Sequence, residues 1–173
     1  ERAEGKTISG AVVLAENQTA GRGRRGKTWV SPFAANLYMS IVWDFDQGAE
    51  ALQGLSLAFG VGVRRTLVEL GLQGIQLKWP NDIYIGGKKL GGILIEMIGD
   101  PNGHCTAIIG IGLNVAMPSL AAQEIDQAWT DLQSQSPLPI SRNTLTAKLV
   151  VTLFDLLKDF QSVGFQAYRD EWE

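Results

Sequence analysis

Four short stretches of the sequence combine residue types that could bind an anionic substrate, and the first is a loop of glycines and arginines. It consists of Gly21, Arg22, Gly23, Arg24, Arg25 and Gly26, and Lys27 follows it. Glycine lets the backbone approach a ligand closely, and clustered cations attract phosphate or carboxylate. No acidic residue occurs between Asn17 and Trp43. The stretch therefore predicts an anion-binding loop, with a solvated basic hairpin loop as the alternative.

The glycine spacing of this loop also matches the G-x-G-x-x-G pattern of dinucleotide-binding proteins. That pattern requires a helix directly after the glycines, whereas Pro32 follows soon after the loop and blocks a helix there. The glycine loop of protein kinases lies between strands, but no H-R-D or D-F-G motif occurs downstream. Both interpretations therefore fail on their sequence context.

The other three stretches place polar residues or glycines at the ends of predicted strands. Residues 78–82 read Lys-Trp-Pro-Asn-Asp, and Pro80 stiffens a corner that fixes the direction of Asn81 and Asp82. Residues 88–94 read Lys-Lys-Leu-Gly-Gly-Ile-Leu, so two lysines lead into a strand whose glycines leave space for a ligand. Residues 110–115 read Gly-Ile-Gly-Leu-Asn-Val. Taken singly, the three could also be an ordinary turn, a charged hairpin end and a glycine bulge.

The periodicity of apolar residues predicts the elements that position these stretches. We expect strands over residues 10–15, 36–43, 75–79, 82–85, 90–97 and from 105 to 109 or slightly beyond. One helix is expected over 49–70, ending at Gly71, and a second after the capping residues 141–144. Turns at 86–87 and 101–103 join successive strands. This is an α+β pattern: a mixed, mostly antiparallel sheet with helices packed on it.

Composition narrows the class of protein. The 173 residues suit one domain, and a net charge of −3 argues against nucleic acid as a partner of this chain. The single cysteine, Cys105, fits a reducing compartment. The single histidine, His104, is adjacent to it, and two adjacent residues do not have the ligand spacing of a protein-built metal site. No apolar run is long enough for a membrane span, and because the start of the sequence is polar we expect no signal peptide there. We therefore expect a cytoplasmic protein without a membrane partner.

In this order, the four stretches resemble the catalytic domain of the biotin–protein ligase family. The resemblance also includes residues 15–20, Trp29, 31–33, 36–38 and Trp129, and it runs from about Gly10 to the end of the sequence. It looks most like the bacterial bifunctional members that also repress the biotin operon. It implies the class II synthetase-like fold shared by biotin and lipoate ligases, as one catalytic domain over residues 1–173. The family's Ser-Thr-Asn segment, DNA-binding domain and C-terminal barrel domain are not expected within this sequence.

The resemblance implies a two-step reaction on biotin and ATP. The biotin carboxylate attacks the α-phosphorus of ATP and gives biotinyl-5'-AMP and pyrophosphate. A lysine of a biotin carboxyl carrier domain of a carboxylase then attacks the mixed anhydride. Mg²⁺ accompanies ATP, because two anions must meet in the first step. A homodimer, paired through sheet edges, is a further expectation.

The same resemblance assigns the site residues to three groups. Biotin binding is expected of Gln18, Gly21, Arg22, Gly23, Arg24, Lys89 and Gly92, with Trp29 and Leu94 lining the ring pocket. Adenylate binding is expected of Arg24, Arg25, Asn81, Asn114 and Trp129. Catalysis is expected of Lys89, Asp82 and Arg24. Lys89 would bridge the biotin carboxyl oxygen and the phosphate, and Asp82 would orient or deprotonate the incoming amine.

Two alternatives remain open. A lipoate ligase or octanoyltransferase shares this fold, but those relatives carry an arginine pair and a glycine run with a histidine nearby, whereas His104 lies far along the sequence from the glycine–arginine loop. The other alternative is an inactive, biotin-binding fragment, or a module that only binds carboxylase carrier domains.

Overall fold

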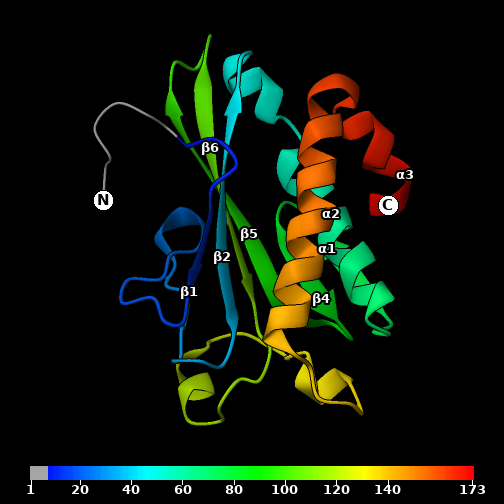
Figure 1. Cartoon of the computed structure of the whole chain (residues 1–173). Helices are drawn as coiled ribbons and strands as arrows, with labels where there is room; N and C mark the ends of the chain where they lie inside the picture. The colour runs from blue at the N-terminus through cyan, green and yellow to red at the C-terminus, as the bar shows by residue number, and fades with distance from the viewer. Residues whose placement is uncertain (1–7) are drawn as a thin grey trace.

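Six strands form one sheet, and the computed structural model, which describes residues 8–173, places the helices on one of its two faces (Figure 1). The strands are β1 (Val12–Ala15), β2 (Leu37–Phe45), β3 (Ile75–Lys78), β4 (Asp82–Ile85), β5 (Lys88–Gly99) and β6 (Cys105–Leu113). Their order is β1-β2-β6-β5-β4-β3, and every neighbouring pair is antiparallel. The α+β prediction is therefore confirmed. The first seven residues, on which the expectation about a signal peptide rests, lie outside the described residues.

The helical layer consists of α1 (Leu55–Glu69), α2 (Arg142–Val163) and the short α3 (Arg169–Trp172). Alternate residues of β2 and β6, such as Ile41 and Ile109, are fully buried beneath this layer and share one hydrophobic core with α1 residues such as Phe59. Each such side chain contributes about 1.5–3 kcal/mol through burial. As predicted, Ser141 caps α2, accepting a hydrogen bond from the backbone N–H of Thr144 at 3.2 Å. No helix within residues 8–173 is both long enough and apolar enough to span a bilayer.

The helix predicted over 49–70 begins later than the hydrophobic pattern suggested. Gly48–Leu52 form a separate 3-10 turn, and α1 begins at Leu55. Between them Gly54 has a φ of +76°, a left-handed conformation that an α-helix cannot contain. A Cβ at Gly54 would lie 2.4 Å from the Cβ of Phe165, so the close approach of a distant segment also requires glycine there.

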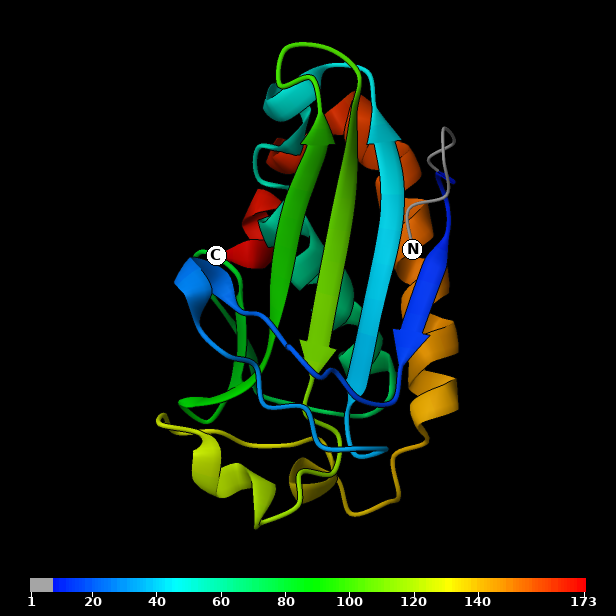
Figure 2. The ribbon, with the colours of Figure 1, turned by 90° about the vertical axis from the view of Figure 1, so that its left-hand side faces the viewer.

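Within residues 8–173, the other face of the sheet carries no α-helix, and we call it the helix-free face. Figure 2 shows the segment between β1 and β2 crossing this face. Gly112 of β6 makes room for it: a Cβ at Gly112 would lie 2.8 Å from the indole of Trp29, so this ring can rest on the sheet only where β6 lacks a side chain. Gly110 and, on β5, Gly92 keep the same face shallow beside it. The helix-free face is thereby shaped to hold a ligand rather than a core.

Candidate functional site

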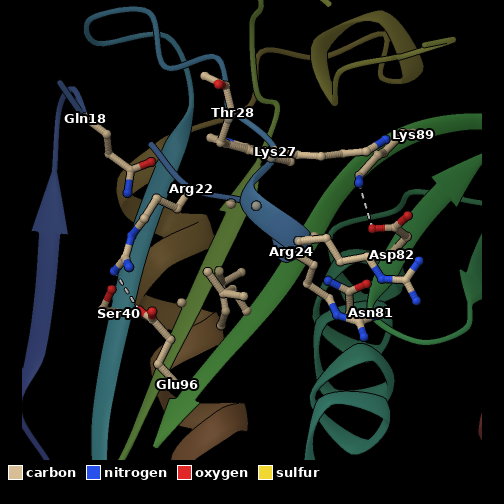
Figure 3. A pocket seen from close by; sticks show the side chains of 18 of the residues that line it. Gln18, Arg22, Arg24, Lys27, Thr28, Ser40, Asn81, Asp82, Lys89 and Glu96 are labelled. Carbon is tan, nitrogen blue, oxygen red and sulfur yellow. Dashed lines mark hydrogen bonds and ion pairs between the residues drawn. The ribbon is translucent and has the colours of Figure 1, made fainter. Parts of the chain in front are cut away.

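A cavity of about 620 Å³ lies between the helix-free face of the sheet and the glycine–arginine loop (Figure 3). The sheet lines it with Ser40 of β2, with Gly92, Leu94 and Glu96 of β5, and with Ile108 and Gly112 of β6. The three residues of β5 are alternate positions, because side chains on a strand alternate between the two faces. The floor is therefore mostly small or apolar, and the polar groups stand around its edge.

The glycine–arginine loop is a hairpin whose base is hydrogen-bonded to the backbone of Trp29. The backbone N–H of Trp29 donates to the carbonyl of Gly21 at 2.9 Å, and that of Gly23 donates to the carbonyl of Lys27 at 2.7 Å. Arg25 turns the chain with a φ of +56°. A Cβ at Gly21 would lie only 2.4 Å from the carbonyl oxygen of Trp29, so this position requires glycine. The hairpin directs the side chain of Arg24 over the cavity (Figure 3).

Lys89 and Asp82 form an ion pair at the edge of the cavity. The Nζ of Lys89 lies 2.7 Å from Oδ1 of Asp82, and their side chains are only 16% and 21% exposed. Asp82 begins β4 directly after the predicted corner, where the side chain of Asn81 donates to the carbonyl of Ile93 at 2.7 Å. A Cβ at Gly92 would contact Oδ1 of Asp82 at 3.5 Å and narrow the space beside the pair.

A second, smaller cavity of about 60 Å³ adjoins the first and shares Thr28, Trp29, Lys89 and Gln127 with it. The backbone N–H of Lys89 donates to the carbonyl of Ala128, and that of Thr130 donates to the carbonyl of Lys89, both at 2.9 Å. These bonds hold half-buried Trp129 at the second cavity. The side chain of Asn114 is buried and donates to the carbonyl of Thr130 at 3.0 Å. Lys89 is therefore the charged residue that lines both cavities.

The cations around the main cavity differ in whether they have an acidic partner. Arg22 pairs with Glu96, its Nη2 lying 2.8 Å from Oε2 of the carboxylate. By contrast, Arg24, Arg25 and Lys27 make no ion pair with any of residues 8–173. Unpaired cations on a glycine-rich hairpin favour an anionic ligand. Within the described part of the chain, no three His, Cys, Asp or Glu side chains are grouped to hold a metal ion.

The predicted site residues come together around these two cavities. The main one is lined by Gln18, Arg22, Gly23, Arg24, Arg25, Asn81, Asp82, Lys89 and Gly92, and by Trp29 and Leu94. Asn114 and Trp129 line the second cavity, and Gly21 lies beneath the loop against Trp29. Their individual roles stay predictions.

Ser40 and Glu96 also line the main cavity, although the sequence did not single them out. Ser40 is separated from Tyr38 by one residue on β2, and Glu96 from Leu94 by one residue on β5. The two-residue alternation of a strand could have placed Glu96 on the face of Gly92 and Leu94. The order of the strands, which brings Glu96 close to Arg22, could not be predicted from this alternation.

Comparison with known proteins accords with this geometry. The family model described as "Biotin/lipoate A/B protein ligase family" matches residues 3–114. The chain is 41% identical over 169 residues to the bifunctional ligase/repressor BirA of Escherichia coli, covering 98% of this chain and 52% of that protein. It is 36% identical over 152 residues to the biotin–[acetyl-CoA-carboxylase] ligase of Mycobacterium tuberculosis, covering 86% and 54%. The chain thus spans about half the length of these curated relatives.

Among solved structures, the biotin protein ligase from Aquifex aeolicus in complex with biotin and ATP superposes with a TM-score of 0.80 at 30% identity. The superposition covers 98% of this chain and 70% of that one. The family match, this likeness of fold and the two cavities that meet at Lys89 all agree, and the chain belongs to the biotin/lipoate A/B protein ligase family.

Proposed function

We propose that this chain is the catalytic domain of a biotin–protein ligase, which activates biotin with ATP and transfers it to a lysine of a carrier protein. The observation that carries the proposal is the position of Lys89 in both cavities. A carboxylic acid in the larger cavity and a nucleotide extending into the smaller one would meet at its ammonium group. The name of the relative from Mycobacterium tuberculosis, and the biotin and ATP bound in the Aquifex aeolicus structure, support the choice of biotin.

In the first step the carboxylate of biotin attacks the α-phosphorus of ATP, a P–O bond forms, and pyrophosphate leaves. Both reactants are anions, so the step needs positive charge where they meet. Lys89 supplies it at the junction, and Arg24 and Arg25 supply it from the hairpin. Mg²⁺ would enter with the phosphates of ATP and neutralise part of their charge. Trp129 and Asn114, which line the smaller cavity, would hold the adenine.

In the second step the ε-amine of the carrier lysine attacks the carbonyl carbon of the anhydride, forms an amide and releases AMP. An ammonium ion is not a nucleophile, so the amine must first lose a proton. Asp82 is the carboxylate beside Lys89 and can accept that proton. The indole of Trp79 is 68% exposed at the rim near Asp82, where an approaching protein would meet it.

The proposed partner is a biotin carboxyl carrier domain, which the name of the Mycobacterium tuberculosis relative supports through its carboxylase. Pairing into a homodimer and a location in the cytoplasm, where ATP and carboxylases occur together, are parts of the same proposal. Residues 1–173 would form its catalytic domain.

The test measures the exchange of labelled pyrophosphate into ATP that each carboxylic acid supports. Biotin, lipoate and octanoate are compared at equal concentrations. We expect exchange with biotin only, and biotinylation when a purified carrier domain is added. Exchange driven by lipoate or octanoate would make the chain a ligase for those acids. Biotin binding without exchange would make it a binding module, and either result contradicts the proposal.

A further inference from the structure

The main cavity is lined by two carboxylates, Asp82 and Glu96, and they lie toward opposite ends of it (Figure 3). Each is paired with a cation: Asp82 with Lys89 at 2.7 Å, and Glu96 with Arg22 at 2.8 Å. The proposed reaction uses the end at Lys89. The pair at the other end is not part of that reaction, and its position calls for a physical explanation.

Glu96 projects from β5 onto the helix-free face, on the same side as Gly92 and Leu94. Figure 3 shows Gln18, Ser40, Arg22 and Glu96 at one end of the cavity, and Arg24, Lys27, Lys89 and Asp82 at the other. Gln18 and Ser40 are neutral groups that can both donate and accept hydrogen bonds. Arg22 is the cation at this end, and Glu96 neutralises it.

Without Glu96, the cavity would present a cation at each end. An acid could then bind with its carboxylate at Arg22, far from Lys89, and a dicarboxylate could engage both ends at once. With Glu96 in place, each end holds one ion pair, but Arg24 and Lys27, which make no ion pair within residues 8–173, lie toward the Lys89 end (Figure 3). The charge that attracts a carboxylate is therefore concentrated at that end, and Glu96 repels a second carboxylate.

We propose that Glu96 is a specificity-determining residue that, by neutralising Arg22, admits acids with one carboxylate and a neutral, hydrogen-bonding opposite end, and excludes dicarboxylates. The inference rests on the proposed function, because it takes the reacting carboxylate to lie at Lys89. It adds a role for Glu96 and a class of acids that the site rejects.

The test compares binding of two acids of equal length, nonanoate and its dicarboxylate counterpart azelate, by titration calorimetry or by competition with biotin. In Glu96→Gln, the affinity for azelate relative to nonanoate should rise by about two- to fivefold, the range that exposed ion pairs give. The side chains of Arg22 and Glu96 are 67% and 41% exposed, which keeps the expected change within that range. If azelate binding is detected in Glu96→Gln but not in the parent, that outcome also supports the proposal.

The matched control is the double variant Arg22→Gln/Glu96→Gln, which has no charge at this end and should return the ratio to the parental value. If Glu96 only anchors the hairpin, Glu96→Gln weakens both acids alike and the ratio stays constant, which overturns the proposal. No gain in azelate binding by a variant that still binds biotin and melts like the parent also overturns it. Failure of the proposed function is a different result, seen as absent pyrophosphate exchange by the parent.

Discussion

Replacing Lys89 by alanine removes the charged residue that both cavities share. The loss has two parts. First, the carboxylate of biotin and the α-phosphate lose their common cation. Second, Asp82, whose Oδ1 lies 2.7 Å from the Nζ of Lys89 in the parent, becomes an uncompensated negative charge beside two anions. Lys88 is the natural comparison, because it precedes Lys89 in β5 but is exposed and lines neither cavity.

The size of the effect follows from the burial of the pair. Two unit charges 4 Å apart at an effective dielectric constant of 20 interact by about 4 kcal/mol, which corresponds to about a thousandfold in rate. Loss of a single strong electrostatic contact in other enzymes costs about 100- to 1,000-fold. We therefore expect Lys89→Ala to slow adenylate formation at least about 100-fold. Lys88→Ala should change it less than about fivefold.

The assay is single-turnover formation of biotinyl-adenylate, measured with the thermal stability of each variant. The double variant Lys89→Ala/Asp82→Asn adds a check on the second part of the loss. Two like charges about 4 Å apart repel by about 1 kcal/mol even when screened as in water, so the double variant should be at least about fivefold faster than Lys89→Ala. Equal rates for Lys88→Ala and Lys89→Ala would refute the assignment of Lys89. A double variant slower than Lys89→Ala would show that Asp82 acts otherwise than by its charge.

Three further predictions concern the amine step, the hairpin and the C-terminal helix. Asp82→Asn keeps the size of the side chain and removes its charge, so transfer to the carrier lysine should slow about 100-fold and more at lower pH, while adenylate formation largely survives; separate assays of the two steps check this, and a defect confined to pyrophosphate release would contradict it. Arg24→Gly should speed release of biotinyl-adenylate about tenfold, as expected for a lost charge-assisted hydrogen bond, and should increase labelling of a bystander protein; unchanged release and labelling would make the loop a solvated turn. Glu171→Gln should lower the free energy of unfolding by less than about 1 kcal/mol at pH 7, because Glu171 and its partner Arg65 are both exposed. The Arg65 guanidinium lowers the pKa of Glu171, so this contribution is present above the unfolded-state pKa and is lost as the pH falls through the folded-state pKa; urea titrations at pH 7 and pH 3 measure it, and an equal difference at both values would be inconsistent with the ion pair.

Local features were predictable because they depend on neighbouring residues. The alternation in 36–43 located β2, and the glycines at 86 and 87 located the hairpin between β4 and the strand predicted over 90–97, which is β5. The prediction that residues 21–26 form a loop, with no helix directly after it, followed from its glycines and the nearby Pro32. The later start of α1 was missed because Gly54 is fixed by Phe165, which is far away in the sequence.

By itself, then, the sequence determined the types of the main elements, the antiparallel hairpins and the polar stretches at their ends, since backbone preferences and side-chain periodicity act over a few residues. Tertiary structure alone decided that β6 lies between β2 and β5. That insertion places Gly112 beneath Trp29 and brings the face of Glu96 beside the loop that carries Arg22. Pairings of this kind depend on the register between strands far apart in the chain, and a one-residue shift would turn Glu96 into the core.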